Sequence, residues 1–319
     1  MTARDEIIKL IKNKNNRNVA IIMHDSPDGD CIGSAVALEE ALKYNNKKVD
    51  IILHNKVSEK FSSIIGENRV NKYIFPYEDK YYDLIFILDV CDFHRTYYEI
   101  LKKGKKKIII DHHLNDYIPK VDCYLNNLDS STGMTLYNII KSICPITKTI
   151  ATALYLTLRS DTEDFKNSST NSKTLMIASE LLQYGADIDI INDIYEYKTY
   201  SYILLLNRTL SNLKIDFENK IAYLIIQQYD IKECGSNMKE AGSIIDLIKS
   251  IKDIEMAFIF IESNDQIVVK ARSKNVDIVD IIKNFGGGGH KCSAGCIINS
   301  DDIYRTKDKV INYAINSIS

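Results

Sequence analysis

The sequence predicts an α/β fold, with a doubly wound, mostly parallel sheet in its N-terminal part and a smaller α/β domain with a mixed sheet after it. Short apolar runs such as residues 19–23 and 84–88 alternate with helical patterns, which is typical of a parallel sheet. Residues 187–213 carry apolar side chains at helical spacing, and alternating strand patterns follow them. We therefore expect a first domain at 1–186, a helical connector at 187–213 and a second domain at 214–319.

In the first domain, each expected strand ends abruptly in polar residues. Pro27 and Gly29 predict a loop after the first strand, with a helix behind it. Gly185 is well placed to end the last helix of the domain. The expected strands are 19–23, 49–53, 84–88 and 107–110, and further expected helices are 2–12, 132–143, 148–159 and 171–184.

In the second domain, the patterns indicate a hairpin, two further alternating strands and several helices. Four consecutive glycines at 286–289 predict a loop. Because glycine loses more conformational freedom on folding than any other residue, a run of four is costly and indicates a specific role. The expected hairpin is 214–227, the strands are 255–262, 266–273 and 294–298, and the helices are 238–251, 276–285 and a last one from 301.

The composition excludes several classes of protein. A net charge of −2 argues against a binder of long duplex nucleic acid, although a local basic pocket could still hold a small anion. Seven scattered cysteines without a C-x-x-C pair fit reduced thiols and a cytoplasmic location. No apolar run approaches the ~20 residues of a membrane helix, and the first residues lack a secretory signal pattern, so we expect no membrane partner.

Acidic and imidazole side chains gather at the ends of the expected strands and helices. Because the carboxyl ends of parallel strands meet at one edge of a sheet, these groups should lie close together. So many carboxylates repel one another unless cations neutralise them, and a mixed oxygen and imidazole set suits Mn²⁺, with Mg²⁺, Co²⁺ or Fe²⁺ as alternatives. Two such ions about 3.5–4 Å apart can stabilise a phosphoester displacement. The residues are His24, Asp28, Asp30, Asp89, Asp111, His112, His113 and Asp161.

These residues also carry a resemblance to a known family. The motif His24-x-x-Pro27-Asp28-x-Asp30, the Asp89 cluster, Asp111-His112-His113 and the Asp161 cluster are similar, in order and spacing, to the four motifs of the Asp-His-His (DHH) phosphoesterase superfamily. Gly286-Gly287-Gly288-Gly289-His290, followed by Ala294-Gly295, resembles the hallmark of that superfamily's C-terminal substrate-binding domain. The layout resembles the subgroup of oligoribonucleases (nanoRNases) that also act as pAp phosphatases.

The resemblance implies a role for each residue of the first domain's motifs. It implies two bound metal ions that activate the attacking water. Asp111 would orient its loop and His113 would contact the scissile phosphate, and both belong with Asp89 to the catalytic set. The implied metal ligands are His24, Asp28, Asp30, Asp89, His112 and Asp161, with Asp89 bridging the two ions.

For the other end of the substrate, the resemblance points to residues of the second domain. Arg272 can pair bidentately with a phosphate, and Ser273 is a weaker candidate beside it. The glycine run can turn backbone N–H groups onto an anion. In the first domain, Arg95 lies six residues after Asp89 and could also reach a phosphate. The implied substrate-binding set is Arg95, Arg272, Ser273, Gly287, Gly288, Gly289 and His290.

The expected activity is the two-metal hydrolysis of short oligoribonucleotides, dinucleotides such as pApA, and pAp. The fourth motif departs from the usual Asp-Thr-Gly, since Glu163 replaces the glycine and could crowd the site or repel a phosphate. A cyclic di-AMP phosphodiesterase is the nearest alternative. A family II pyrophosphatase ranks lower, because it lacks the Gly-Gly-Gly-His signature, and a catalytically dead nucleotide-binding module would lack a metal ligand. The oligomeric state, including a homodimer, stays open.

Overall fold

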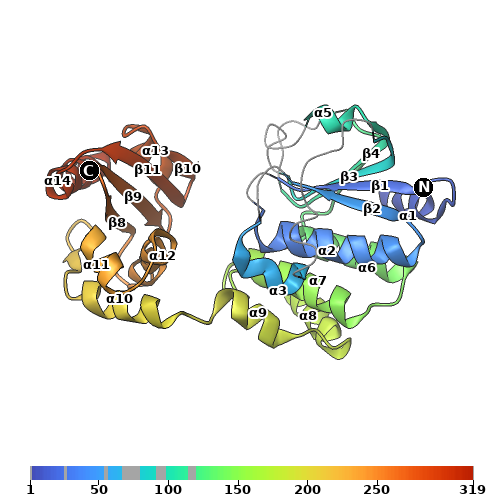
Figure 1. The fold of residues 1–319 in the computed structure, drawn as a ribbon, viewed down its shortest axis with the longest axis horizontal. Coiled ribbons are helices and arrows are strands. Elements are labelled where there is room, and N and C mark those ends of the chain that lie inside the picture. The colour runs from blue at the N-terminus through green and yellow to red at the C-terminus, as the bar shows by residue number, and fades with distance from the viewer. Residues whose placement is uncertain are drawn as a thin grey trace. The chain divides into compact units, whose positions relative to one another are not determined.

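The computed structural model describes residues 2–24, 27–53, 57–66, 80–90, 98–113 and 120–318. The chain divides into two compact units, Met1–Tyr197 and Lys198–Ser319 (Figure 1). Each unit has its own sheet and its own buried core. The predicted α/β class, with a parallel sheet first and a mixed sheet second, is confirmed.

The described strands of the N-terminal unit form one parallel sheet in the order β2-β1-β3-β4-β5. Every neighbouring pair is parallel, and the register aligns Ile22 with Ile87 and Leu88 with Ile110. The carboxyl ends of β1, β3 and β4 therefore lie side by side. The strands are β1 Asn18–Ile22, β2 Lys48–Ile52, β3 Tyr82–Leu88, β4 Gly104–Asp111 and β5 Cys123–Asn126.

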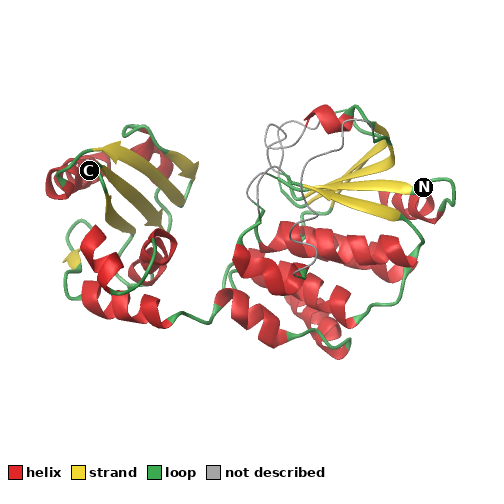
Figure 2. Ribbon diagram, in the orientation of Figure 1, coloured by secondary structure: helices red, strands yellow, loops and turns green. Residues whose placement is uncertain are grey.

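Helices pack on this sheet because its strands are apolar on both faces. Helices α2, α6 and α7 lie on one side of the sheet and α5 on the other (Figure 2). Ile21 and Phe86 belong to the core on the first side, whereas Ile22 and Ile87 belong to a core on the opposite face that includes Ile100 of α5. The helical elements are α1 Ala3–Lys12, α2 Gly29–Tyr44, η1 Glu59–Phe61, α3 Ser62–Ile65, α5 Tyr98–Leu101, α6 Thr132–Ile143, α7 Lys148–Asp161, α8 Ser172–Gln183 and α9 Ile188–Tyr195.

The C-terminal unit is built on a mixed sheet in the order β10-β11-β9-β8-β7-β6, in which only the β7–β8 pair is parallel among the described strands. Cores lie on both faces of this sheet. The elements are α10 Tyr200–Leu210, β6 Lys214–Asp216, β7 Ile221–Ile226, α11 Gln228–Glu233, α12 Met238–Lys249, β8 Met256–Ser263, β9 Gln266–Ser273, α13 Ile278–Lys283, β10 Gly288–His290, β11 Ser293–Asn299 and α14 Ile303–Ile318.

The structure corrects the expected continuous helix at 187–213. Helix α9 ends at Tyr195, and α10 begins at Tyr200 after a new N-cap, where the Thr199 hydroxyl accepts the backbone N–H of Tyr202 at 3.0 Å. The apolar residues of the two helices serve different cores, since Ile191 is buried in the N-terminal unit and Leu205 in the C-terminal unit. The periodicity is therefore real, but it belongs to two helices.

Two strands also differ from the sequence prediction. Strand β5 was not predicted, because its four residues alternate between buried and half-buried positions at the sheet edge and form no apolar run. The second half of the glycine run is an edge strand, β10, in which Gly288 pairs with Gly295, rather than a loop. In the described part of the chain, no helix has the length and apolar character that a membrane span requires.

Candidate metal centre

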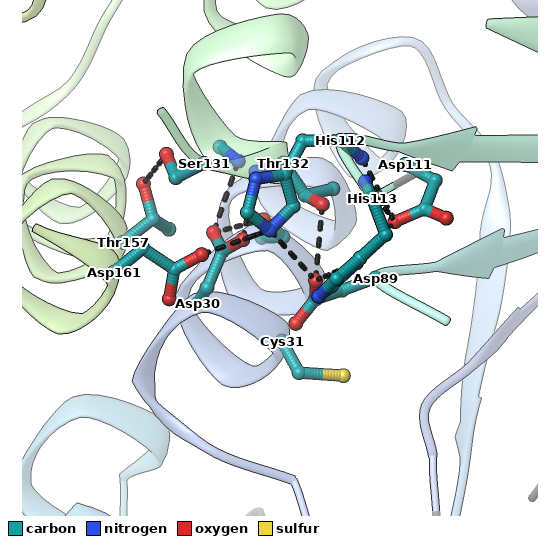
Figure 3. A network of polar contacts seen from close by, with 12 residues as sticks. Asp30, Cys31, Asp89, Asp111, His112, His113, Ser131, Thr132, Thr157 and Asp161 are labelled. Atoms are coloured by element: carbon teal, nitrogen blue, oxygen red, sulfur yellow. Dashed lines mark hydrogen bonds and ion pairs between the residues drawn. The ribbon is translucent and has the colours of Figure 1, made fainter. Parts of the chain in front are cut away.

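The acidic and imidazole residues of the N-terminal unit meet where β1, β3 and β4 end, against the N-termini of α2 and α6 and the C-terminus of α7. Figure 3 shows the side chains of Asp30, Asp89 and Asp161 directed at the ring of His112. Three overlapping groups of potential ligand atoms lie within 4.8 Å of one another: His24, Cys31 and Asp89; Asp89, His112 and His113; and Asp30, His112 and Asp161.

Asp30 is fully buried at the start of α2 and is held by the first turn of α6. Its Oδ2 accepts the backbone N–H of Thr132 at 2.7 Å, and its Oδ1 accepts that of Gly133 at 3.0 Å. The backbone N–H groups of a helix's first turn have no carbonyl partner within the helix, and the helix N-terminus favours a negative charge. The carboxylate orientation is therefore set by α6, and burial together with the charges of Asp161 and Asp89 raises the pKa of Asp30 well above its usual value.

Asp89 follows β3 in the left-handed backbone region, with a φ of 57°. Its N–H donates to the Ile110 carbonyl oxygen at 3.1 Å, so the strand pairing continues through this residue. Its Oδ1 accepts the Thr132 hydroxyl at 3.2 Å and lies 3.5 Å from His112 Nε2. Aspartate tolerates this conformation better than most residues, and such outliers concentrate at functional sites.

His112 is the residue on which the carboxylates converge. Its Nδ1 lies 3.2 Å from the Asp129 carbonyl oxygen, which can only accept, so Nδ1 carries the hydrogen. Its Nε2 lies 2.9 Å from Asp161 Oδ2, 3.5 Å from Asp89 Oδ1 and 3.7 Å from Asp30 Oδ2, yet this buried nitrogen makes no hydrogen bond of good geometry within the described residues. A neutral ring would therefore point a lone pair at three carboxylates.

A cation at this point resolves the conflict. Although burial alone lowers the pKa of His112, attraction by Asp161 and Asp89 raises it to about 11. Burial likewise raises the pKa of Asp161 to about 6. Both shifts mean that the cluster binds positive charge, and a divalent metal ion supplies it while accepting the Nε2 lone pair. The donor set thus fits divalent metal ions.

Asp111 and His113 form a hydrogen-bonded pair beside this cluster. Asp111 is fully buried at the end of β4, and its Oδ1 accepts the backbone N–H groups of His112 and His113 at 2.8 and 3.3 Å. The same oxygen lies 2.8 Å from His113 Nδ1, whose ring is one-third exposed. Asp111 therefore fixes the backbone of both histidines and the ring orientation of His113.

Two expected ligands lie on the loop between β1 and α2. His24 is buried directly after Met23. Asp28 is the N-cap of α2, and its Oδ1 accepts the backbone N–H groups of Asp30 and Cys31 at 3.0 and 3.1 Å, which leaves its Oδ2 as the candidate metal ligand. Cys31 was not predicted as a site residue, although its sulfur lies within the group formed by His24 and Asp89.

Glu163 occupies a position that explains the glycine usual in the fourth motif. Its φ is 48°, and Asp164 and Phe165 follow with φ values of 64° and 61°, so three consecutive residues adopt the left-handed conformation. Glycine adopts this conformation without steric cost. The Glu163 side chain is exposed to solvent, so the structure gives no sign of the crowding that the sequence led us to expect.

The expected substrate-binding residues of the second domain lie in the C-terminal unit, at the β9-β11-β10 edge of the sheet. Arg272 is partly exposed, with its Nε 3.6 Å from Asp246 Oδ1. Ser273 is buried and donates its hydroxyl hydrogen to the Val276 carbonyl oxygen at 2.6 Å, so that hydrogen is engaged inside the unit. Arg95 and the side chain of His290 lie outside the described part of the structure.

The glycines of this unit have different reasons for being glycine. A Cβ on Gly287 would lie 2.4 Å from the Gly295 carbonyl oxygen, and one on Gly289 would lie 2.3 Å from that of Ser293. These two positions are therefore required by the packing of β11. A Cβ at Gly288, as at Gly286, would lie in open space, so the backbone of Gly288 is accessible to a ligand.

Sequence reasoning missed three residues that support the centre. Thr132 donates to Asp89, and the Asp129 carbonyl sets the tautomer of His112. The Ser-Ser-Thr-Gly segment at the start of α6 was a usable signal for Thr132, because this composition is typical of a helix N-terminus. No sequence pattern predicts the contact of the Asp129 carbonyl. The same holds for Tyr195 of α9, whose hydroxyl lies against the backbone of Gly29.

The fold and this cluster define a two-domain α/β protein with a candidate dinuclear metal centre at the edge of a parallel sheet. The model of the DHH family N-terminal domain matches residues 18–158, and that of the DHHA1 domain matches residues 218–316. The chain belongs to the DHH family, as its motifs predicted.

Relatives and a solved structure extend over nearly the whole chain. A Streptococcus mutans protein named as a probable bifunctional oligoribonuclease and PAP phosphatase NrnA is 28% identical, covering 96% of this chain and 98% of that protein. The Bacillus subtilis bifunctional oligoribonuclease and PAP phosphatase NrnA is 26% identical, with 88% of each chain covered. An exopolyphosphatase-related protein from Bacteroides fragilis has the same fold, with a TM-score of 0.83 at 24% identity over 99% of this chain and 96% of its own.

Proposed function

We propose that this protein is a manganese-dependent phosphoesterase that hydrolyses short oligoribonucleotides, dinucleotides such as pApA, and pAp. The main observation in support is that Asp30, Asp89 and Asp161 converge on His112 Nε2. The full-length similarity to relatives named as oligoribonuclease and PAP phosphatase supports the substrate class. We further propose a cytoplasmic location, which the free cysteines of the described chain support.

The residues of the N-terminal unit divide into metal ligands and groups that act on the substrate. We assign six side chains as those that would hold two Mn²⁺ ions, and five of them, all except Asp28, belong to the three groups of neighbouring ligand atoms. When bound, the ions would activate water and neutralise charge on the phosphoryl group. The proposed ligands are His24, Asp28, Asp30, Asp89, His112 and Asp161.

His113 and Asp111 act on the phosphate in this proposal. Asp111 accepts the Nδ1–H of His113 at 2.8 Å, and although burial lowers the pKa of His113, this hydrogen bond raises it. The protonated ring could then donate its Nε2–H to a phosphate oxygen as negative charge develops there. Hydrolysis of pApA then breaks the bond between phosphorus and the 3′ oxygen of the ribose. Water supplies the new phosphate oxygen and the proton of the leaving hydroxyl, and two AMP molecules are released.

In the C-terminal unit, we assign Arg272 and the open backbone at Gly288 to the phosphate at the far end of the substrate. Arg272 is partly exposed, donates from Nη1 to the Ala271 carbonyl oxygen at 3.0 Å, and has its Nε 3.6 Å from Asp246 Oδ1, whose own side chain is mostly exposed. An ion pair this exposed contributes little, so the guanidinium could exchange it for a phosphate at low cost. Arg95 and His290 stay predictions, and we give Ser273 the role of shaping the turn before α13.

Product analysis on a substrate panel tests the proposal. With Mn²⁺, the protein would be incubated with pAp, pApA, cyclic di-AMP, RNA of two to twelve nucleotides, and pyrophosphate, followed by chromatography. We expect 5′-mononucleotides from pApA and the shortest RNAs, and loss of this activity in Asp89→Ala. Asp253→Ala, an exposed aspartate of the C-terminal unit, serves as the matched control. Preferential cleavage of cyclic di-AMP would reassign the substrate, and no turnover at all would reject the activity.

A further inference from the structure

One side chain of helix α9 lies beside the candidate metal centre. Tyr195 is the last residue of this helix, and its hydroxyl lies against the backbone of Gly29, the residue between Asp28 and Asp30. An ideal Cβ on Gly29 would lie only 2.1 Å from the Tyr195 hydroxyl oxygen. No side chain larger than hydrogen fits at position 29 while the phenol stays in place, so the close approach depends on this glycine.

The same phenol also meets the segment that carries Asp161. The Gly29 Cβ position lies 2.9 Å from Ser160 Oγ as well as 2.1 Å from the Tyr195 hydroxyl oxygen, so both side chains lie against the backbone of Gly29. Ser160 directly precedes Asp161 at the end of α7. The Tyr195 hydroxyl thus lies where the start of α2 and the end of α7 come together, and both segments carry proposed metal ligands.

The position of Tyr195 is fixed by the packing of α9. Arg159, buried in the last turns of α7, donates to Asn192 Oδ1 at 2.7 Å and to Glu196 Oε1 at 2.9 Å. Ile191 and Ile194 of the same helix are buried in the core of the unit. Helix α9 is therefore attached to the end of α7 by both charge and apolar contact.

The environment of the ring keeps the phenol protonated. Burial raises the pKa of Tyr195 to about 12, since it outweighs the opposing effect of Ser160, and the negative charges of Asp28, Asp161 and Asp30 act in the same direction as burial. The ammonium of Lys60 lies 5.0 Å from the ring centroid, at cation–π distance.

We propose that Tyr195 is a positioning residue, whose hydroxyl holds the α2 start and the α7 end at the separation that the metal ions require. It acts on metal binding through the Gly29 backbone and Ser160 and does not touch the ions. The inference rests on the metal centre of the proposed function. Groups that orient metal ligands without binding the metal typically change affinity or activity by about 10–100-fold.

The direct test measures Mn²⁺ affinity from the electron paramagnetic resonance signal of free Mn²⁺, on the full chain. Tyr195→Phe keeps the ring and removes only the hydroxyl. We expect its Mn²⁺ dissociation constant to rise by about 10–100-fold, with pApA turnover restored by excess Mn²⁺. Tyr184→Phe, a tyrosine 40% exposed in the same unit, should bind Mn²⁺ like the wild type.

Two outcomes separate this inference from the proposed function. Equal Mn²⁺ affinity in Tyr195→Phe and the wild type would overturn the role of Tyr195 and leave the metal centre standing. A wild-type protein that binds no divalent metal would overturn both. Loss of turnover that excess Mn²⁺ does not restore would show that the hydroxyl acts in another way, and would also reject the inference.

A second variant pair tests the contact itself. Gly29→Ala introduces a methyl group where the phenol oxygen lies, so the hydroxyl must move away. In that background, the further change Tyr195→Phe should not weaken Mn²⁺ binding any more. A Tyr195→Phe effect of the same size in both backgrounds would contradict the proposed contact at Gly29. If Gly29→Ala does not fold, the single Tyr195→Phe comparison decides.

Discussion

At the scale of single residues, hydrogen bonds from groups outside the proposed ligand set orient the side chains of the candidate metal centre. The Asp129 carbonyl fixes the hydrogen of His112 on Nδ1, and the first turn of α6 orients Asp30. These contacts orient His112 Nε2 and the Asp30 carboxylate toward a common point. Preorganisation of this kind lowers the cost of assembling the site when metal arrives.

His112 should be the residue whose loss is felt most. His112→Ala removes the nitrogen on which three carboxylates converge, so we expect at least the ~100-fold loss in metal affinity or activity seen at the upper end for merely supporting groups. Metal content after purification and pApA turnover would both be measured. Circular dichroism checks the fold. A variant that retains full metal content and turnover would remove His112 from the centre.

Glu163 should report on backbone strain rather than on charge. Its left-handed φ of 48° costs a non-glycine residue about 1–2 kcal/mol, partly offset by the entropy of glycine in the unfolded chain. We expect Glu163→Gly to raise the free energy of unfolding by up to about 1 kcal/mol and Glu163→Gln to leave it unchanged. Urea unfolding measures both. A lower KM for pApA in Glu163→Gln would instead show that the charge repels the substrate.

At the scale of elements, the parallel strands place their last residues at one edge, while side chains at the opposite ends hold them in register. Asp83 in β3 is buried, and its Oδ2 accepts the backbone N–H groups of Arg17 and Asn18 at 2.8 and 3.0 Å, where β1 begins. Its Oδ1 lies 2.7 Å from Lys105 Nζ of β4. One carboxylate therefore joins three strands.

Asp83 should make stability depend on acid pH. Burial alone would raise its pKa, but Lys105 and the two backbone N–H groups outweigh burial and lower it. Since the folded pKa lies below the unfolded value of about 3.9, the stabilisation is present above that value and is lost as pH falls through the folded pKa.

Asp83→Asn should accordingly lower the free energy of unfolding by about 1–3 kcal/mol at neutral pH, and by less at pH 3. Urea unfolding at several pH values measures the difference. Lys105→Met, whose parent side chain is 75% exposed, is the comparison and should cost less than about 1 kcal/mol. A pH-independent difference for Asp83→Asn would refute the assignment.

Element prediction from sequence succeeded where apolar runs were long and failed where tertiary pairing decided. The strands ending at Leu88 and Asp111 were evident because they are buried on both faces. Strand β5 and the edge strand at Gly288 exist because a neighbour pairs with them, which no local pattern records. The helix break after Tyr195 was hidden because residues on both sides of it are apolar at helical spacing.

At the scale of the whole molecule, the proposed function divides two tasks between the two units. The N-terminal unit contains the complete candidate metal centre, and the C-terminal unit carries Arg272 and the glycine strand. From the motif order, we predicted the metal ligands in a first domain and the glycine run in a second. Contacts such as those of Thr132 and Tyr195 could not be predicted, because they join segments that are distant in sequence.

This separation predicts a separation of kinetic effects. Arg272→Ala should raise the KM for pApA by about tenfold or more, because a charge-assisted contact with phosphate contributes about 1.5–3 kcal/mol. Mn²⁺ affinity should not change. Steady-state kinetics and metal titration on the same preparation measure the two effects. Equal loss of metal affinity would contradict the division of labour, and Lys283→Ala, an exposed lysine of the same unit, is the control.

In the proposed mechanism, the carboxylates around His112 hold metal ions that the protein needs to hydrolyse short nucleotides. The most direct measurement is AMP release from pApA by protein stripped with a chelator, with and without restored Mn²⁺. We predict no release from the stripped protein and full release once Mn²⁺ is added back. Release from the metal-free protein at the same rate, or no release although Mn²⁺ is bound, would contradict the proposed mechanism.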